Sequence, residues 1–382
     1  MILKTSAWSS LWTFPSILLS SFIIAWGAEA AQFLISQGLA LAILAWLQTM
    51  PEFAVEAVIA WQAGKDPSKT HLVIANFTGS LRLLVGLGWP MIYFVAAVAR
   101  KKFIAIELDD EHSVEIFALL LPIAYFTFIW WKGSLTLWDA FPLTACYLVY
   151  LWVLWKIPPR SSDEEALDDL GVIPRRALAL PPVQRNIAIL SMFVIGGLVL
   201  YFSAHPFLDS MLAIAGTLGI STFVFVQWVA PFLSEFPEKL SAFYWARKVS
   251  TANVALMNMV SSNINQWSIL SAMIPIIFVI SSGELRPLTF DRFQRHEIIL
   301  TILQSFLGFL LLLNLELKLH EAIILFTFWF VQFVVPPWRE AMIYVYLGWC
   351  LIEIGKLIAS RSAPAAWHGL RRTLAEHMAQ GT

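Results

Sequence analysis

The sequence predicts an all-α polytopic membrane protein with about 10–11 transmembrane helices in two inverted repeats, each with a proline-broken helix. Three observations support this fold class. First, 59% of the 382 residues are hydrophobic and 13% are charged, whereas a soluble domain has about 25% charged residues. Second, apolar segments long enough to cross a bilayer, about 20 residues, cover most of the chain. Third, a Pro-Glu pair occurs twice inside such segments, at Pro51-Glu52 and Pro237-Glu238.

Composition also excludes several classes of function. The net charge of −1 leaves no basic surface for nucleic acid. Metallohydrolase and nucleotide-binding motifs are absent from the sequence, and no nucleophile–base pair suggests an intramembrane enzyme. We therefore expect no enzymatic activity and no cofactor. Cys146 and Cys350 lie in apolar segments, which is typical of small buried hydrophobic residues.

Eleven segments are apolar and long enough to span a membrane. Several exceed one bilayer thickness, so they must tilt or break, and Pro51, Pro231 and Pro237 mark the expected breaks. The segments are 11–31, 33–62, 70–99, 114–132, 134–156, 186–204, 207–246, 251–282, 296–316, 319–336 and 338–358.

A polar stretch divides these segments into two halves. Residues 157–185 combine mixed charge with five prolines, which indicates a solvated linker. The predicted organisation is a first half over 1–156, the linker, a second half over 186–358, and a tail over 359–382 that forms a short surface helix.

The distribution of basic residues predicts the orientation. Loops on the side of residues 100–113 carry fifteen Lys and Arg, and loops on the opposite side carry eight. The positive-inside rule therefore places the N-terminus outside and the linker and C-terminus in the cytoplasm. The alternative, that 11–31 is a cleaved signal peptide, would invert this topology. We expect an integral protein of the plasma membrane or bacterial inner membrane.

The two Pro-Glu pairs belong to a longer repeat, with repeat 1 over 33–99 and repeat 2 over 207–282. Gln48 to Glu52 aligns with Ser234 to Glu238, and Asn76 to Ser80 aligns with Asn258 to Ser262. Five segments precede the linker, so the two halves enter the membrane from opposite sides. Inverted repeats with broken helices are typical of secondary transporters that bind an ion at the repeat interface.

Both repeats carry polar stripes on otherwise apolar helices. Gln48, Glu52 and Glu56 follow i, i+4, i+8 spacing and share one helix face. Hard divalent cations bind six to eight oxygen ligands, which carboxylates, amides and hydroxyls can supply. The candidate metal ligands are Thr49, Glu52, Asn76, Ser80, Ser234, Glu235, Glu238, Asn258, Ser262 and Gln266.

With these motifs, the chain resembles the cation/calcium exchanger superfamily, the sodium/calcium exchanger-like membrane proteins. The resemblance covers roughly 33–99 and 207–282 and implies Glu52 and Glu238 as core carboxylates, with Ser80 and Ser262 as hydroxyl ligands. The chain departs from the family pattern by carrying Leu84 where an amide or acid is usual and Glu235 where a hydroxyl is usual. Segment 338–358 exceeds the family's common ten.

The resemblance implies a secondary active antiporter that exchanges Ca²⁺, or a related divalent cation, for Na⁺ or H⁺ by alternating access. Its partners would be the lipid bilayer and inorganic cations. The alternative is a non-transporting membrane scaffold or sensor, which Arg82 and Leu84 favour. At i+2 from Ser80, however, Arg82 lies about 200° around the helix and should face away from the site. Glu56 either contacts the ion or pairs with Arg82 or Lys239.

Overall fold

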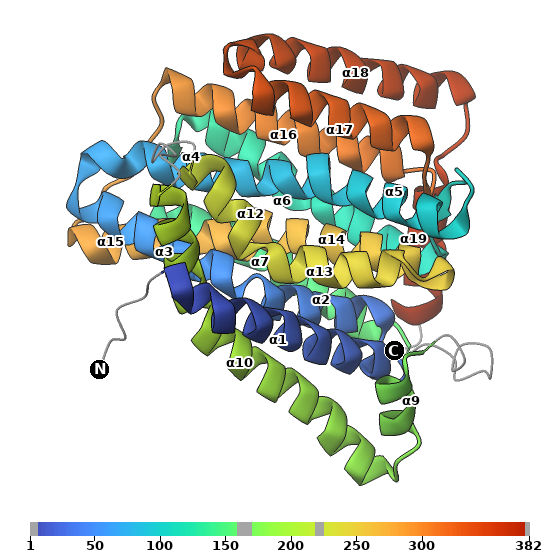
Figure 1. The fold of residues 1–382 in the computed structure, drawn as a ribbon. Helices are drawn as coiled ribbons and strands as arrows, with labels where there is room; N and C mark the ends of the chain where they lie inside the picture. The colour runs from blue at the N-terminus through green and yellow to red at the C-terminus, as the bar shows by residue number, and fades with distance from the viewer. Residues whose placement is uncertain (1–6, 159–169, 218–224, 379–382) are drawn as a thin grey trace.

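Long apolar helices run side by side through the molecule (Figure 1). The computed structural model describes residues 7–158, 170–217 and 225–378. The first half contains α1 (Ser10–Ala31), α2 (Gln37–Gln48), α3 (Met50–Lys65), α4 (Thr70–Leu83), α5 (Trp89–Arg100), α6 (Ser113–Lys132) and α7 (Ala140–Lys156). The second half contains α10 (Pro182–Thr217), α12 (Ala230–Ser234), α13 (Phe236–Ala246), α14 (Ala252–Asn265), α15 (Ser271–Ser282), α16 (Arg292–Leu312), α17 (Leu319–Val334) and α18 (Arg339–Ser360).

Within the described ranges, eight helices are long and apolar enough to cross a membrane, or nine if the bent pair α2–α3 counts as one span. α17 is apolar but shorter. One predicted boundary is wrong: the sequence separates segments 186–204 and 207–246 near Pro206, but α10 continues through Pro206 to Thr217. A proline removes one backbone hydrogen bond, and a long apolar helix tolerates that loss.

Each repeat contains a broken helix, as predicted. α2 and α3 meet at an angle of 47° around Thr49, and α12 and α13 are separated at Glu235. In both cases the break lies two residues before proline, at Pro51 and Pro237, because proline disfavours helical geometry in the residue before it and lacks the N–H of the next turn.

Each repeat also contains a π-helical turn that the sequence did not predict. Residues Leu84–Gly88 (η3) connect α4 to α5, and residues Gln266–Leu270 (η8) connect α14 to α15. A third π-helical turn, Phe225–Val229 (η6), leads into α12. Such turns are frequent at functional sites.

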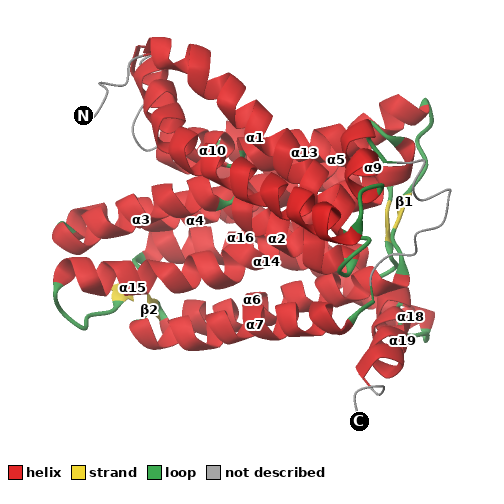
Figure 2. Ribbon diagram, turned by 90° about the horizontal axis from the view of Figure 1, so that it is seen from below, coloured by secondary structure: helices red, strands yellow, loops and turns green. Residues whose placement is uncertain are grey.

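Two short antiparallel strand pairs demonstrate the inverted orientation of the halves. β1 (Ile106–Glu107) pairs with β4 (Glu316–Leu317), and β2 (Ser134–Leu135) pairs with β3 (Leu288–Thr289). β1 and β2 lie at opposite ends of α6 (Figure 2). β1 follows α5 and its repeat counterpart β3 follows α15, yet β3 lies at the other end of the bundle, with β2. Equivalent elements of the two halves therefore point in opposite directions.

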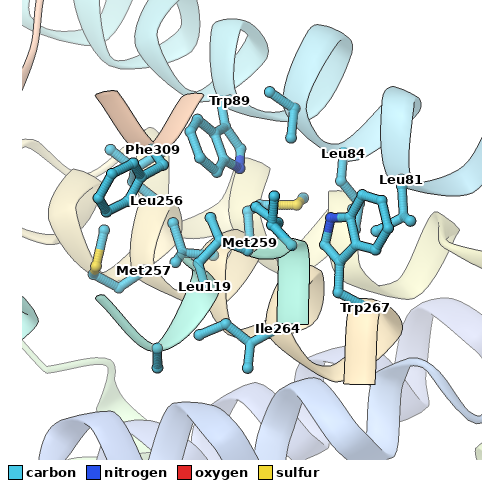
Figure 3. Close-up of a cluster of buried hydrophobic side chains, with 14 of the residues drawn as sticks. Leu81, Leu84, Trp89, Leu119, Leu256, Met257, Met259, Ile264, Trp267 and Phe309 are labelled. Atoms are coloured by element: carbon cyan, nitrogen blue, oxygen red, sulfur yellow. The ribbon is translucent and has the colours of Figure 1, made fainter. Parts of the chain in front are cut away.

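The apolar core lies where α4–α5 crosses α14. In Figure 3, Leu81, Leu84 and Trp89 face Met259 and Trp267 across this crossing. Leu119 of α6 and Phe309 of α16 close the cluster from the sides. Van der Waals packing of these side chains holds the helices together at the crossing, and it fixes the positions of the polar residues on the same helices.

Polar segments flank the bundle. The linker contains a short helix, α9 (Val172–Leu178), while its residues 159–169 lie outside the described part. Residues 218–224 of the predicted repeat 2 lie outside it too. The tail forms helix α19 (Ala365–Met378), as expected, and the Ala366 N–H donates to the Leu313 carbonyl. The short 3₁₀ turns are Ala7–Ser9, Pro67–Lys69, Asp110–His112 (η4), Leu137–Asp139, Val249–Thr251 and Pro336–Trp338.

Candidate functional site

The two helix breaks meet two polar segments inside the bundle. These segments, which we call the polar islands, are Asn76 to Ser80 and Asn258 to Ser262. α4 packs against α3, α12 and η6, while α14 packs against α2 and α13. The predicted site residues are fully buried there: Gln266, Thr49, Glu52, Asn76, Ser80, Ser234, Glu235, Glu238, Asn258 and Ser262. Buried carboxylates at this depth are costly unless they are paired or functional.

Glu52 is held by one donor from each repeat. Asn76 Nδ2 donates to Glu52 Oε1 over 2.8 Å and to Glu56 Oε2 over 2.6 Å. The Ser234 hydroxyl, from the break in repeat 2, donates to Glu52 Oε2. Both Glu52 oxygens are therefore hydrogen-bonded, and the carboxylate lies on the interface between the repeats.

Glu235 is the most fully paired carboxylate of the site. Its Oε1 accepts from the Ser80 hydroxyl and from Gln266 Nε2, the latter over 3.0 Å. Its Oε2 accepts from Lys239 Nζ over 2.5 Å, and both charged side chains are almost completely buried. The structure thus brings Ser80, Gln266 and Glu235 together, but it surrounds Glu235 with internal donors.

Glu238 has the opposite environment. Neither of its buried carboxylate oxygens has a partner in good hydrogen-bond geometry among the described residues, although the Ser262 hydroxyl lies close enough to interact with the carboxylate. The Ser262 hydroxyl and the Asn258 Oδ1 share this condition. Glu238 lies within electrostatic reach of Glu52 and Glu235. Buried acceptors without donors are rare in folded proteins and call for an explanation such as an ion or water.

Thr49 is turned away from the carboxylates. It accepts from Asn265 Nδ2 over 2.6 Å and donates to the Ala45 carbonyl over 2.9 Å. Gln48 likewise spans the repeats, donating to the Ser241 hydroxyl. These contacts join the break in repeat 1 to α13 and α14 of repeat 2, so in this arrangement Thr49 contributes to packing between the repeats.

The donor set suits a hard cation with mixed oxygen ligands. No three His, Cys, Asp or Glu side chains within 7–158, 170–217 and 225–378 converge closely enough to hold a metal ion by themselves. Amide and hydroxyl oxygens must therefore complete any cation site here. Asn76 Oδ1 and Glu56 Oε1 are buried acceptors without a donor, in addition to those around Glu238. Such oxygens are the ligand type that Ca²⁺ prefers.

A second buried polar cluster, which we call the arginine cluster, lies beside the site and was not predicted. Glu297 of α16 forms ion pairs with Arg82 of α4 and with Arg339, the latter over 3.3 Å. Gln227 Nε2, from η6, donates to Glu297 Oε2 over 2.9 Å. The Trp228 ring lies against both guanidinium groups, with its centroid 5.1 Å from Arg82 and 5.6 Å from Arg339.

The structure shows the surroundings of Arg82 and Glu56, for which the sequence left alternatives open. Arg82 faces away from the ion-site carboxylates, as its position after Ser80 predicts, and it also donates to Gln332 over 3.0 Å. Glu56 pairs with neither Arg82 nor Lys239, because it accepts from Asn76. Arg339 is one of the eight basic residues that the sequence analysis assigned to loops on the side opposite residues 100–113. That interpretation is wrong, because Arg339 is buried against Glu297. The signal available in the sequence was Glu297, a carboxylate inside the apolar segment 296–316.

The sequence matches the model of the family described as "Sodium/calcium exchanger protein" over residues 5–156 and 188–336. These two ranges include both broken helices and both polar islands. The chain belongs to the sodium/calcium exchanger family. The family match and the apolar helices together show an integral membrane transporter rather than a member of an enzyme family.

Solved exchanger structures share the fold. A structure entitled "Crystal Structure of H+/Ca2+ Exchanger CAX" is 31% identical, with a TM-score of 0.80, and the match covers 96% of this chain and 91% of that chain. A structure of the sodium-calcium exchanger NCX_Mj soaked with Na⁺ and Ca²⁺ is 18% identical, with a TM-score of 0.62, covering 85% and 96%. At this lower identity the likeness concerns the fold alone. No curated protein matches the sequence.

Proposed function

We propose that this family member is a secondary active antiporter that exchanges Ca²⁺, or a related divalent cation, for Na⁺ or H⁺ at the interface of its two repeats. The observation that carries the proposal is the unpaired Glu238 carboxylate. It lies within electrostatic reach of a second buried carboxylate, Glu52, from the opposite repeat. A divalent cation between them would supply the missing partners and neutralise both charges.

The residues divide into expected roles. Glu238, Ser262 and Asn258 offer oxygens that are free of donors, and Glu52 would join them by releasing its bond from Ser234 or Asn76. Between cations, the same carboxylates must bind a counter-ion or protons, since isolated buried charges are costly. This requirement couples loading of one ion to release of the other.

The identity of the counter-ion is supported by the 31% identity to the H⁺/Ca²⁺ exchanger. We therefore place H⁺ first and Na⁺ second. With inverted repeats, access to the site would alternate between the two membrane faces. The charge distribution favours the β1–β4 end as cytoplasmic and the β2–β3 end as external.

Uptake of Ca²⁺ into proteoliposomes under an outward H⁺ or Na⁺ gradient tests the proposal. We expect gradient-driven uptake by the unmodified protein and loss of uptake, by at least about tenfold, in Glu52→Gln/Glu238→Gln, because the pair of buried charges is removed. Glu340→Gln, an exposed carboxylate outside the bundle interior, is the matched control and should transport normally.

Normal transport by the correctly folded double variant would overturn the proposed site. Absence of uptake by the unmodified protein for Ca²⁺, Mg²⁺, Mn²⁺ and K⁺ would favour the alternative, a non-transporting scaffold or sensor. Arg82 gives that alternative less support than the sequence suggested, because it pairs with Glu297 and does not face the ion-site carboxylates. Leu84, at the position equivalent to Gln266, remains in its favour.

A further inference from the structure

Lys239 places an ammonium group inside the candidate cation site. Its Nζ lies 2.5 Å from Glu235 Oε2, and its charge also reaches Glu52 and Glu238. The Phe232 ring lies 5.6 Å from Nζ and adds a cation–π contact. An ammonium paired with one carboxylate and within electrostatic reach of two others supplies the positive charge that a mobile monovalent cation would otherwise supply.

Three internal donors surround Glu235, and one of them carries a positive charge. Ser80 and Gln266 donate to one of its oxygens and Lys239 to the other. Glu238, one turn along the same helix, has neither oxygen bonded to any described residue. The two neighbouring carboxylates thus differ in kind: one has an internal counter-charge and the other does not.

In the repeat alignment, the acidic and the basic residue of this pair both replace neutral residues of repeat 1. Glu235 aligns with Thr49, and Lys239 aligns with Phe53, so repeat 1 has neutral residues at both positions. The i, i+4 spacing places Glu235 and Lys239 on one helix face. Relative to repeat 1, the site gains one negative and one positive charge, and its net charge is unchanged.

We propose that Lys239 is a built-in cation that occupies the Glu235 subsite, so that mobile cations bind only on the Glu238 side. This inference rests on the proposed antiport function and specifies it further: Lys239 takes the place of one mobile monovalent cation, and Glu235 is a positioning residue rather than an ion ligand. The expectation from the sequence that Glu235 ligates the transported ion is replaced by this role.

Removing the ammonium should open the subsite. In Lys239→Met the side chain keeps its length but loses its charge, and Glu235 keeps the donors Ser80 and Gln266 but loses its counter-charge. We expect Na⁺, titrated against choline at constant ionic strength, to raise the thermal unfolding midpoint of purified Lys239→Met at concentrations at least about tenfold below any effect on the unmodified protein. Equal Na⁺ responses of the two proteins would overturn the inference. Lys239→Arg keeps the charge and should likewise show no added Na⁺ response.

A second variant tests the pair as a unit. Glu235→Thr/Lys239→Phe installs the residues of positions 49 and 53 and removes both charges together. We expect it to keep Ca²⁺-dependent stabilisation within about threefold of the unmodified protein and to gain no Na⁺ response, because the net charge near Glu238 is preserved. Glu235→Thr alone should weaken the Ca²⁺ response by about tenfold or more, since Lys239 then repels the ion.

The outcomes separate this inference from the antiport proposal. If the double variant folds but loses its Ca²⁺ response, Glu235 is a direct ligand and the inference is wrong, whereas antiport still stands. If no divalent cation stabilises the unmodified protein, the antiport proposal loses its support, while a new Na⁺ response in Lys239→Met would still establish the built-in cation. Should Lys239→Met fail to fold, the double variant decides.

Discussion

Glu297 lies between two arginines, Arg82 and Arg339, and forms ion pairs with both. We expect Glu297→Gln to lower the free energy of unfolding by about 3–5 kcal/mol, because it leaves two buried guanidinium groups without their counter-charge. Thermal unfolding in detergent would measure this. The partly exposed pair of Glu316 with Lys318 is the control, and Glu316→Gln should cost less than about 1 kcal/mol. Similar losses in both variants would show that the arginine cluster contributes little.

The sequence predicted residues whose pattern repeats and missed those that depend on distant contacts. Glu52 and Glu238 were found because each follows a proline within an apolar segment. Glu297 and Arg339 lie near segment ends, where an interfacial charge is the ordinary interpretation, and their pairing requires α4, α16 and α18 to be placed in space. Lys239 was missed for a different reason: its i+4 spacing from Glu235 is local, but Glu235 was predicted as an ion ligand.

At the scale of elements, α4 depends on a close approach to η6. A Cβ built on Gly79 would lie 1.9 Å from the backbone carbonyl oxygen of Gln227. We therefore expect Gly79→Ala to force α4 and η6 apart and to destabilise the protein by about 1–3 kcal/mol, the usual range for overpacking. Since Ser80 is the next residue, cation-dependent stabilisation should weaken in the same variant. Thermal unfolding with and without Ca²⁺ measures both effects.

Gly348 in α18 provides the matched control for this element. A Cβ there meets nothing within 4 Å, so Gly348→Ala should be neutral or stabilising by up to about 1 kcal/mol through helix propensity. If Gly79→Ala were equally well tolerated, the close approach of α4 to η6 would not be required for folding.

The elements differ in how well sequence could locate them. Proline predicted both helix breaks within two residues, because its missing N–H acts locally. The π-helical turns η3 and η8 escaped prediction, since one extra residue in a helical turn leaves no mark on the apolar pattern. The continuity of α10 through Pro206 was missed because the neighbouring helices, not the local sequence, determine whether a proline ends a helix.

At the scale of the whole molecule, the predicted orientation can be measured. After replacement of Cys146 and Cys350, single cysteines would be placed at Ser68, between α3 and α4, and at Lys102, after α5. Both positions are exposed and lie at opposite ends of the bundle. We expect a membrane-impermeant maleimide to label Ser68→Cys from outside intact cells and Lys102→Cys only after permeabilisation. The reverse pattern would invert the topology, as a cleaved signal peptide at 11–31 would require.

The cross-paired strands have a consequence for the direction of transport. Because β1 joins β4 at one end and β2 joins β3 at the other, the two repeats present equivalent elements to opposite sides of the membrane. The pseudo-twofold symmetry of the repeats does not itself favour one direction of transport. The two ion gradients set the net direction of exchange. Side chains that differ between the repeats, such as Lys239 opposite Phe53 and Glu235 opposite Thr49 in the ion site, can only make rates and apparent affinities differ between the two sides.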